Sequence, residues 1–504
     1  MAQKPVFILN STGLNSFEEP KVDGVLVSRI TLNRVRSRFE DIAVLVEKGR
    51  SLPELEGVKL LRLEKSDLFS ALTAVLEAFP DRDVYLFADL YAPFLEAELG
   101  ERYAAITQER IAHYTYGEHY PRGVAPHALA QDTVRILRNV ASGNFTPMGD
   151  EAFMNLMGLD INSYDIEVDV SPDDFRRYRL DLRARNRERV ALIAQLSSAL
   201  GSGIEGVSYS KLSQLLLQRQ DLHRSLPAYL ELDLSDNCSL SCNFCPREAM
   251  GLSGVADGAV IEEGLALRIV EELARLNPDA CLCLSPFSEP LESPIWRKVA
   301  DRALGSGLHL FIETNGLAMD ALFREWFLAQ EAEKLSVIVS LDLLSAEEYK
   351  QYKGADRYSE AVANTRALLT AGAGNCYLQV LNMDEFSSVI DGFYDFWPEY
   401  SDRVLPRKYN SFCGRLELRS TADLSPLTRF PCWHLKRDIV IRCSGKVQLC
   451  KQDLDGVEFE GDLTKESLQK LWARLGERFQ AHLSGDDRGI PLCKECDEWH
   501  TYNF

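Results

Sequence analysis

The sequence predicts an α/β protein of several domains, with a parallel sheet in the second half of the chain. The length of 504 residues exceeds what a single hydrophobic core usually organises, so we expect roughly three or four domains. Apolar runs typical of strands alternate with stretches of helical periodicity. Hydrophobic residues make up 46% of the chain and charged residues 26%, which is typical of globular domains.

Net charge and the lengths of the apolar runs limit the partners of the chain. The formal net charge of −20 argues against binding dominated by nucleic-acid phosphates, which needs clustered Lys and Arg. The first apolar run, Val6–Leu9, is too short for a signal peptide, and no stretch approaches the roughly 18 to 20 apolar residues of a membrane helix. We therefore expect a cytoplasmic protein without membrane or nucleic-acid partners.

Residues 1–145 are predicted to form an α/β domain with strands at Val6–Leu9, Val25–Val27 and Val84–Phe87. The segments Ala88–Pro93 and Tyr120–Gly123 resemble parts of the nucleotidyltransferase-like fold of cytidylyltransferases. Those enzymes open with a Gly-rich loop and a basic residue that hold a triphosphate, whereas Asn10–Leu14 has one glycine and two acids soon follow it. We expect a degenerate domain for docking or substrate presentation, in which Asp89 alone retains metal-binding chemistry.

Residues 146–225 are rich in charge and helix formers, which predicts a helical connector. From 226 to 425 the pattern becomes a regular βα repeat. We expect strands at Tyr229–Leu234, Ala280–Leu284, His309–Ile312, Leu335–Ser340 and Tyr377–Leu381, and helices near 263–276, 294–304, 319–329, 357–371 and 386–396. Right-handed crossovers would curl these units into a (β/α)6 partial barrel, with ligands at the C-terminal ends of the strands.

All twelve cysteines lie after residue 237, which indicates metal ligands rather than a disulfide framework. Cys238, Cys242 and Cys245 follow the first barrel strand with the spacing Cys-x3-Cys-x2-Cys. Three thiolates on one loop can hold three irons of a [4Fe–4S] cluster and leave the fourth iron open. A zinc or purely structural site is the alternative, although zinc usually takes Cys-x2-Cys pairs and four protein ligands.

This loop, including Phe244 before the third cysteine, resembles that of the radical SAM superfamily. The resemblance implies that the open iron chelates S-adenosylmethionine (SAM). It implies further SAM contacts at the ends of the next strands. Ser285–Pro290 resembles the Gly-Gly-Glu-Pro element, with Glu289 accepting the SAM ammonium, but Pro286 and Ser288 restrict the backbone where the family has glycine. The other implied SAM-binding residues are Phe244, Asn315, Ser340 and Asp342.

A second cysteine group lies in residues 426–504. Cys432 and Cys450 have the spacing Cys-x12-Gly-x4-Cys, and Cys493 and Cys496 form a later Cys-x2-Cys pair. The pattern resembles the SPASM domain, a small α+β extension of radical SAM enzymes, and implies one auxiliary [4Fe–4S] cluster, since the chain ends eight residues after the pair. Zinc is the alternative here too. The order of domains resembles the family called spiro-SPASM.

The resemblance implies an enzyme that reductively cleaves SAM to a 5′-deoxyadenosyl radical and modifies a peptide or protein, with an electron donor such as flavodoxin or ferredoxin. Cys413 follows the last barrel strand and is our candidate hydrogen donor to a substrate radical. One alternative is oxidation or epimerisation of a sugar or nucleotide-sugar. Another is a non-catalytic iron–sulfur redox or scaffold protein.

Overall fold

The computed structural model describes residues 4–14, 19–52, 55–143, 146–149, 151–201, 203–255, 257–285, 287–419, 425–485 and 489–501. Pro286 lies outside these ranges. The chain forms two compact units, Met1–His223 and Arg224–Phe504. Among the described residues, no helix combines the length and the apolar character that a membrane crossing would need.

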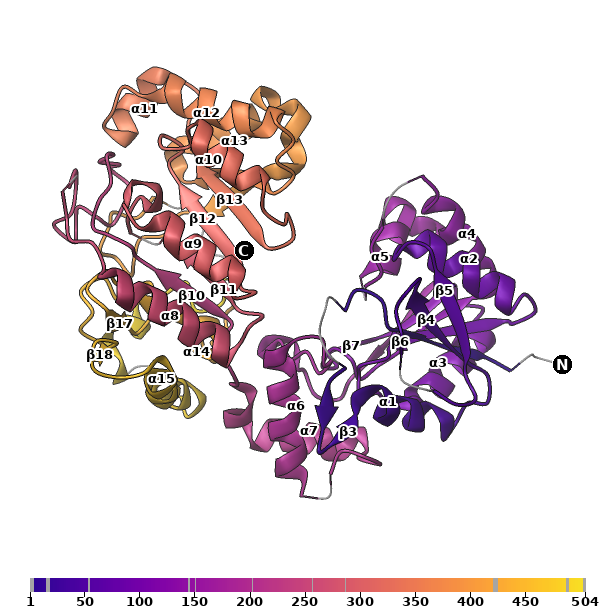
Figure 1. The fold of residues 1–504 in the computed structure, drawn as a ribbon. Helices are drawn as coiled ribbons and strands as arrows, with labels where there is room; N and C mark the ends of the chain where they lie inside the picture. The colour runs from indigo at the N-terminus through magenta and orange to yellow at the C-terminus, as the bar shows by residue number, and fades with distance from the viewer. Residues whose placement is uncertain are drawn as a thin grey trace. The chain divides into compact units, whose positions relative to one another are not determined.

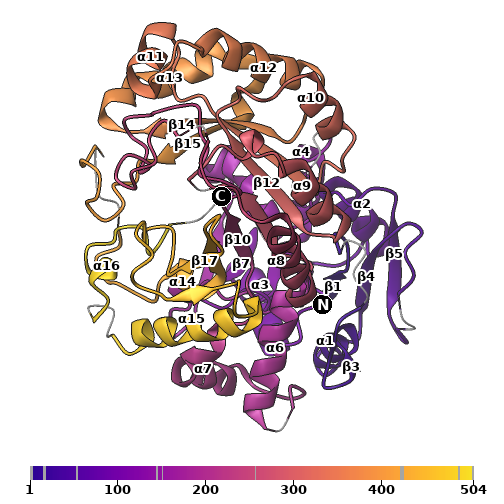
Figure 2. The same cartoon turned by 60° about the vertical axis from the view of Figure 1, so that its left-hand side comes forward.

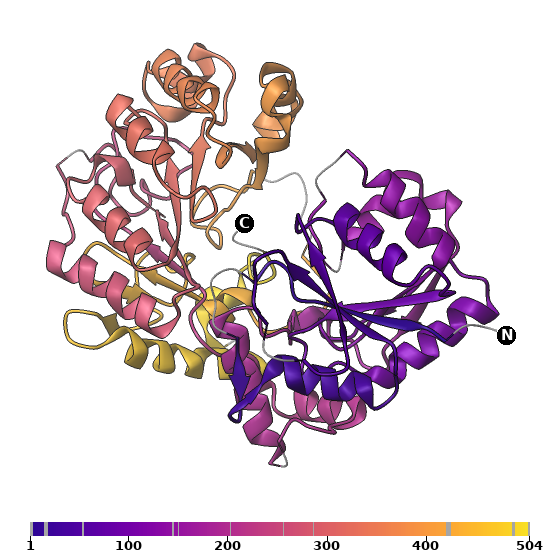
Figure 3. The ribbon, with the colours of Figure 1, turned by 45° about the vertical axis from the view of Figure 1, so that its right-hand side comes forward.

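The first unit is built on a seven-stranded sheet of order β5-β4-β1-β6-β8-β7-β9 (Figure 3). Only β8 runs antiparallel to its neighbours β6 and β7. The strands are β1 (Val6–Asn10), β4 (Ile42–Glu47), β5 (Lys59–Leu63), β6 (Val84–Asp89), β7 (Tyr114–Glu118), β8 (His127–Ala130) and β9 (Ile166–Val170), and a separate hairpin joins β2 (Lys21–Val22) to β3 (Val25–Leu26).

Helices cover both faces of this sheet because alternate residues of its central strands are apolar on both sides. Val6 and Ile8 face one core and Phe7 and Leu9 the other. The first face carries α2 (Leu68–Ala78), α4 (Gln131–Val140) and α5 (Ala152–Met157); the second carries α1 (Val27–Arg36), α3 (Ala97–Glu109), α6 (Arg187–Leu200) and α7 (Tyr209–Gln218).

Residues 146–225, expected as a helical connector, instead contribute a strand and two helices to the first unit. β9 pairs with β7, and residues of α6 and α7 belong to the core of the first unit. The alternation of apolar and acidic residues in Ile166–Val170 is a strand pattern, which the high charge of the region obscured.

The second unit contains the predicted βα repeat (Figure 1). Six consecutive parallel strands occur in the order β15-β14-β13-β12-β11-β10. They are β10 (Tyr229–Leu232), β11 (Cys281–Leu284), β12 (His309–Thr314), β13 (Leu335–Ser340), β14 (Cys376–Asn382) and β15 (Val404–Lys408). The helices are α8 (Glu263–Leu276), α9 (Trp296–Gly305), α10 (Ala321–Leu328), α11 (Ala346–Lys353), α12 (Tyr358–Thr370) and α13 (Ser387–Phe396). The prediction of an α/β fold with this repeat is confirmed.

The C-terminal segment continues the same sheet. Its first strand, β16 (Asp438–Ile441), pairs in parallel with β10, and β17 (Lys446–Gln448) and β18 (Gly461–Asp462) follow antiparallel. Figure 2 shows α14 (Trp433–Arg437) and α15 (Leu468–Leu483) beside these strands; α16 (Pro491–Lys494) completes the segment. Gly445 has φ +79° in the β16–β17 turn, where a side chain would meet Leu265 and Thr464. We expected the auxiliary cysteines to lie outside the barrel, but their segment shares its sheet and hydrophobic core.

Candidate active site

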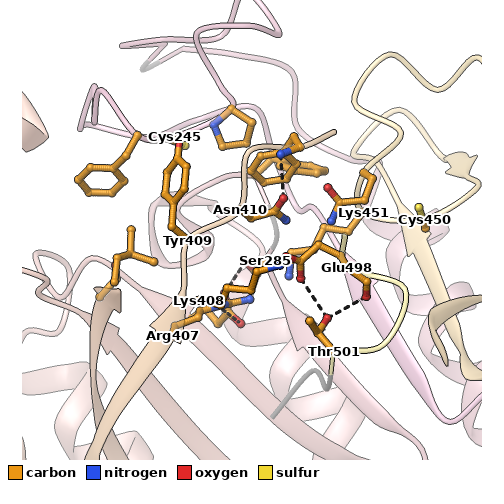
Figure 4. A pocket seen from close by; sticks show the side chains of 18 of the residues that line it. Cys245, Ser285, Arg407, Lys408, Tyr409, Asn410, Cys450, Lys451, Glu498 and Thr501 are labelled. Carbon is orange, nitrogen blue, oxygen red and sulfur yellow. Dashed lines mark hydrogen bonds and ion pairs between the residues drawn. The ribbon is translucent and has the colours of Figure 1, made fainter. Parts of the chain in front are cut away.

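A cavity of about 530 Å³ opens in the second unit, and both cysteine groups line it. Its lining includes Cys238, Cys242 and Cys245, and also Cys432, Cys450, Cys493 and Cys496. Figure 4 shows one cysteine of each group, Cys245 and Cys450, apart from each other. Glu289, Asn315 and Ser340, which follow or end neighbouring parallel strands, also line it. The cavity therefore lies where a parallel α/β sheet usually binds ligands.

The loop of the first cysteine group is held by backbone hydrogen bonds from outside it. The Cys238 N–H donates to the Val255 carbonyl at 2.9 Å. The Ser241 and Asn243 N–H groups donate to the carbonyls of Lys353 and Tyr352, at the end of α11. Gly354 ends this helix with φ +73°, where a side chain would collide with Ser241. Helix α11, which sequence reasoning missed, thus supports the loop.

The three thiols of this loop are protonated when no metal is bound. Burial raises the pKa of Cys238 and of Cys242 to about 12, and that of Cys245 to about 11. A bound metal would deprotonate them. Among the described residues, no three His, Cys, Asp or Glu side chains converge as ligands of a single metal ion.

Glu289 is a buried carboxylate that faces the cavity. Its oxygens accept hydrogen bonds from the Thr314 hydroxyl and the Asn315 N–H, both at 2.7 Å. No cation among the described side chains forms an ion pair with it. Burial raises its pKa to about 7. A ligand that brings a positive charge would therefore stabilise the ionised form, as predicted for the SAM ammonium.

Asn315, Ser340 and Phe244 all line the cavity, as expected of SAM contacts. The Asn315 amide nitrogen Nδ2 is buried and has no hydrogen-bond partner, so it is available to a ligand. The Ser340 hydroxyl donates to Asp342 at 2.5 Å, and Phe244 packs edge-on against Phe386. These positions agree with the predicted SAM-binding roles, which stay predictions.

Asp342 is not among the residues that line the cavity, and its predicted place among the SAM contacts stays a prediction. Its side chain is fully buried and accepts from three donors: the Lys353 ammonium at 2.8 Å, the Ser340 hydroxyl and the Leu381 N–H. Asp342 has φ +61°, an uncommon backbone conformation. Asp342 therefore holds Ser340 and Lys353, which do line the cavity.

The structure brings the four auxiliary cysteines together from separate elements. Cys432 precedes α14, Cys450 follows β17, Cys493 lies in α16 and Cys496 follows it. The pKa of Cys450 is raised well above its ordinary value. Burial is the main cause, and the nearby thiols of Cys496, Cys432 and Cys493 add to it. His482 Nε2 lies 3.4 Å from the Cys493 sulfur. Four clustered thiols with a histidine neighbour fit a closed iron–sulfur cluster.

Cys413 is placed differently from our expectation. It does not line the cavity; its thiol is hydrogen-bonded to that of Cys496. This bond raises the pKa of Cys413 and lowers that of Cys496. Cys413 is therefore a fifth thiol beside the auxiliary group, and its role as a hydrogen donor remains a prediction. Cys443 contacts Asp236 instead of this group.

Sequence reasoning missed a set of ion pairs whose half-buried cations line the cavity. Arg407 contacts Glu313 at 3.2 Å, and Lys451 contacts Glu231 at 2.9 Å. Lys408 contacts Asp497 and Glu498 at 2.7 and 2.6 Å. Figure 4 shows Arg407, Lys451 and Glu498 in the cavity that Cys245 and Cys450 also line. The available signal was a charged residue inside an otherwise apolar strand, as at Glu231 in Tyr229–Leu232.

In the first unit, the residues expected to form a degenerate nucleotide site are bonded to one another. Asp89, at the end of β6, is ion-paired with Arg185. The same guanidinium donates to the carbonyls of Thr12 and Asn10, in the loop after β1. The Gly13 N–H, which would face a phosphate in a Gly-rich loop, donates to Glu47 at 2.8 Å. The chain's own side chains thus satisfy the groups that a nucleotide and its metal would need.

Comparisons with known proteins connect the chain to one protein family and one domain family. Residues 432–497 match the SPASM family, described as an iron–sulfur cluster-binding domain. An uncharacterized protein of Treponema pallidum is 30% identical over 358 residues, which cover 68% of this chain and 96% of that protein.

Solved structures give more distant similarities. SuiB of Streptococcus suis, bound to the precursor peptide SuiA, is 14% identical with a TM-score of 0.44, covering 58% of this chain and 78% of that chain. A cytidylyltransferase of Leptospira borgpetersenii is 13% identical with a TM-score of 0.36, covering 44% of this chain and 96% of that chain.

Proposed function

The chain belongs to the same family as the treponemal protein, and residues 432–497 are a SPASM domain. From this premise we propose that the chain is a radical SAM enzyme that cleaves SAM to modify a peptide or protein. The observation that carries the proposal is a single cavity lined by an incomplete set of three cysteines and a complete set of four. Three thiolates leave one iron of a [4Fe–4S] cluster open for SAM, whereas four close the second cluster.

When bound, the first cluster supplies the electron that cleaves SAM to methionine and a 5′-deoxyadenosyl radical. The chain's own residues bind and orient SAM. Glu289 accepts a hydrogen bond from the SAM ammonium, Asn315 Nδ2 donates to an acceptor atom of SAM, and Ser340 is held at the cavity wall by Asp342. Apolar side chains such as Phe244 and Leu381 exclude water from this part of the cavity.

A polar substrate is favoured by the ion-paired side chains that line the cavity beside the SAM contacts. Arg407, Lys408 and Lys451 offer donors, and Glu313 and Glu498 offer acceptors. A peptide presents both N–H and C=O groups, which these side chains can satisfy. Sugar hydroxyls also donate and accept, so the isotope experiment below decides between the two classes. We propose a peptide or protein substrate, with the electron delivered by a protein such as flavodoxin or ferredoxin in the cytoplasm.

Iron content and SAM cleavage test the cluster assignment. Anaerobically reconstituted protein should hold about eight irons and form 5′-deoxyadenosine under reducing conditions. Replacing Cys238, Cys242 and Cys245 together by Ala should leave about four irons and no 5′-deoxyadenosine, since only the auxiliary site remains. A wild-type protein that binds zinc and no iron would refute the proposal.

The substrate class is tested by following hydrogen abstraction. Reconstituted enzyme is incubated with SAM and one of two fractions from perdeuterated cells, either polypeptides or small molecules. We expect deuterium in 5′-deoxyadenosine with the polypeptide fraction only, because the radical takes its hydrogen from substrate. Deuterium from the small-molecule fraction alone would favour the sugar alternative.

A further inference from the structure

The loop that carries Glu289 is supported by polar contacts in the segment that resembles the Gly-Gly-Glu-Pro element. Asp233 directly follows β10, is fully buried, and accepts a hydrogen bond from the Phe287 N–H at 3.0 Å. The Phe287 carbonyl accepts one from Arg247 at 2.6 Å. The Glu289 N–H donates to the Asn237 carbonyl at 2.8 Å. The position of the Glu289 carboxylate therefore depends on Asp233 and on the cysteine loop.

Arg442 reaches this support from the C-terminal segment. It follows β16, the strand that pairs with β10. Its Nε lies 2.9 Å from Asp233 Oδ2, which makes an ion pair that is not aligned as a hydrogen bond. Its Nη2 donates a hydrogen bond to Asp236 Oδ1 at 3.0 Å. Its guanidinium also lies over the Phe287 ring, 5.0 Å from the ring centre. One side chain thus contacts both the Glu289 loop and the residue two positions before Cys238.

We propose that Arg442 is a positioning residue for SAM, through which the C-terminal domain sets the geometry of the Glu289 loop. Without Arg442, Asp233 and Asp236 would be two carboxylates in or near the protein interior without a compensating cation. The uncompensated Asp233 carboxylate would shift, and Phe287 would shift with it because its N–H donates to Asp233. Glu289 lies two residues after Phe287. This inference goes beyond the proposed function but rests on it, because it assumes that SAM binds beside Glu289.

The experiment measures the SAM dissociation constant of anaerobically reconstituted full-length variants by equilibrium dialysis. We expect Arg442→Gln to bind SAM about tenfold more weakly, because small displacements of a binding group have large effects. Its iron content should stay at the wild-type level. Arg442→Lys should recover part of the affinity, since it keeps the charge but cannot reach both carboxylates. In turnover, KM for SAM should rise more than kcat falls.

Arg474→Gln is the matched control. Arg474 is another arginine of the C-terminal segment, paired with Glu466 at 2.7 Å and remote from the Glu289 loop by its contacts. It should bind SAM within twofold of the wild type. If Arg442→Gln does not fold, Asp236→Asn replaces it and should weaken SAM binding several-fold.

Wild-type SAM affinity in a fully loaded Arg442→Gln, or in Asp236→Asn, would overturn the inference. So would equal weakening in Arg474→Gln, which would indicate a general loss of stability. A wild-type protein that holds both clusters but does not bind SAM would instead refute the proposed function. The two failures are therefore distinguishable.

Discussion

Glu289 is the residue with the most direct test. Glu289→Gln should weaken SAM binding about tenfold to a hundredfold, because a hydrogen bond to a charged group is worth roughly 1.5 to 3 kcal/mol. Iron content should not change, since the thiolates remain. Glu263→Gln, which removes a surface carboxylate paired with Lys298, is the control and should bind SAM normally. Unchanged affinity in Glu289→Gln would place the ammonium elsewhere.

The raised pKa of Glu289 predicts a pH dependence. Without SAM the carboxylate has a pKa of about 7, and burial is the main cause. A cationic ligand favours the ionised form, so SAM affinity should fall as the pH drops below about 7. Because the pKa of Glu289 is higher in the folded than in the unfolded chain, the free energy of unfolding of the SAM-free protein should fall as the pH rises from the ordinary Glu pKa toward 7. Affinity measured between pH 6 and 8 should lose this dependence in Glu289→Gln; a retained slope would assign it to another group.

At the scale of elements, β16 and the auxiliary cysteines have separable roles. Cys493→Ala should lower the iron content from about eight to about four and abolish the auxiliary electron paramagnetic resonance signal, because a cluster needs its ligands. It should still form 5′-deoxyadenosine, since β16 and Arg442 remain in place. The control is Cys376→Ala, which removes a buried core thiol in β14 and should keep both clusters. Loss of 5′-deoxyadenosine in Cys493→Ala with the first cluster intact would contradict this separation.

At the scale of the whole molecule, the first unit should have no nucleotidyl transfer activity. Full-length protein given Mg²⁺ and CTP should release no pyrophosphate, because Arg185 forms an ion pair with Asp89 and donates a hydrogen bond to the loop after β1. Arg185→Ala should remain inactive, since the phosphate-binding glycines are absent, and it should lower the free energy of unfolding by about 3 kcal/mol by leaving Asp89 unpaired. Pyrophosphate release from the wild type would show a working site.

The sequence alone determined the features that depend on local spacing. The βα repeat follows from apolar periodicity. The Cys-x3-Cys-x2-Cys loop and the Cys-x12-Gly-x4-Cys pattern predict cluster ligands from short segments of sequence. The predicted strand Leu335–Ser340 and helix 263–276 match the structure to the residue. Local side-chain patterns suffice for such elements.

Tertiary structure decided the features that join distant segments. Only the fold pairs β16 with β10 and so brings Arg442 to Asp233. Only the fold pairs Asp342 with Lys353 and leaves Asp342 outside the cavity lining. Cys413 looked free for substrate, yet it lies against Cys496, 83 positions later in the chain. The physical reason is that a buried charge or thiol is satisfied by whichever partner the packing supplies, and sequence separation places no limit on that partner.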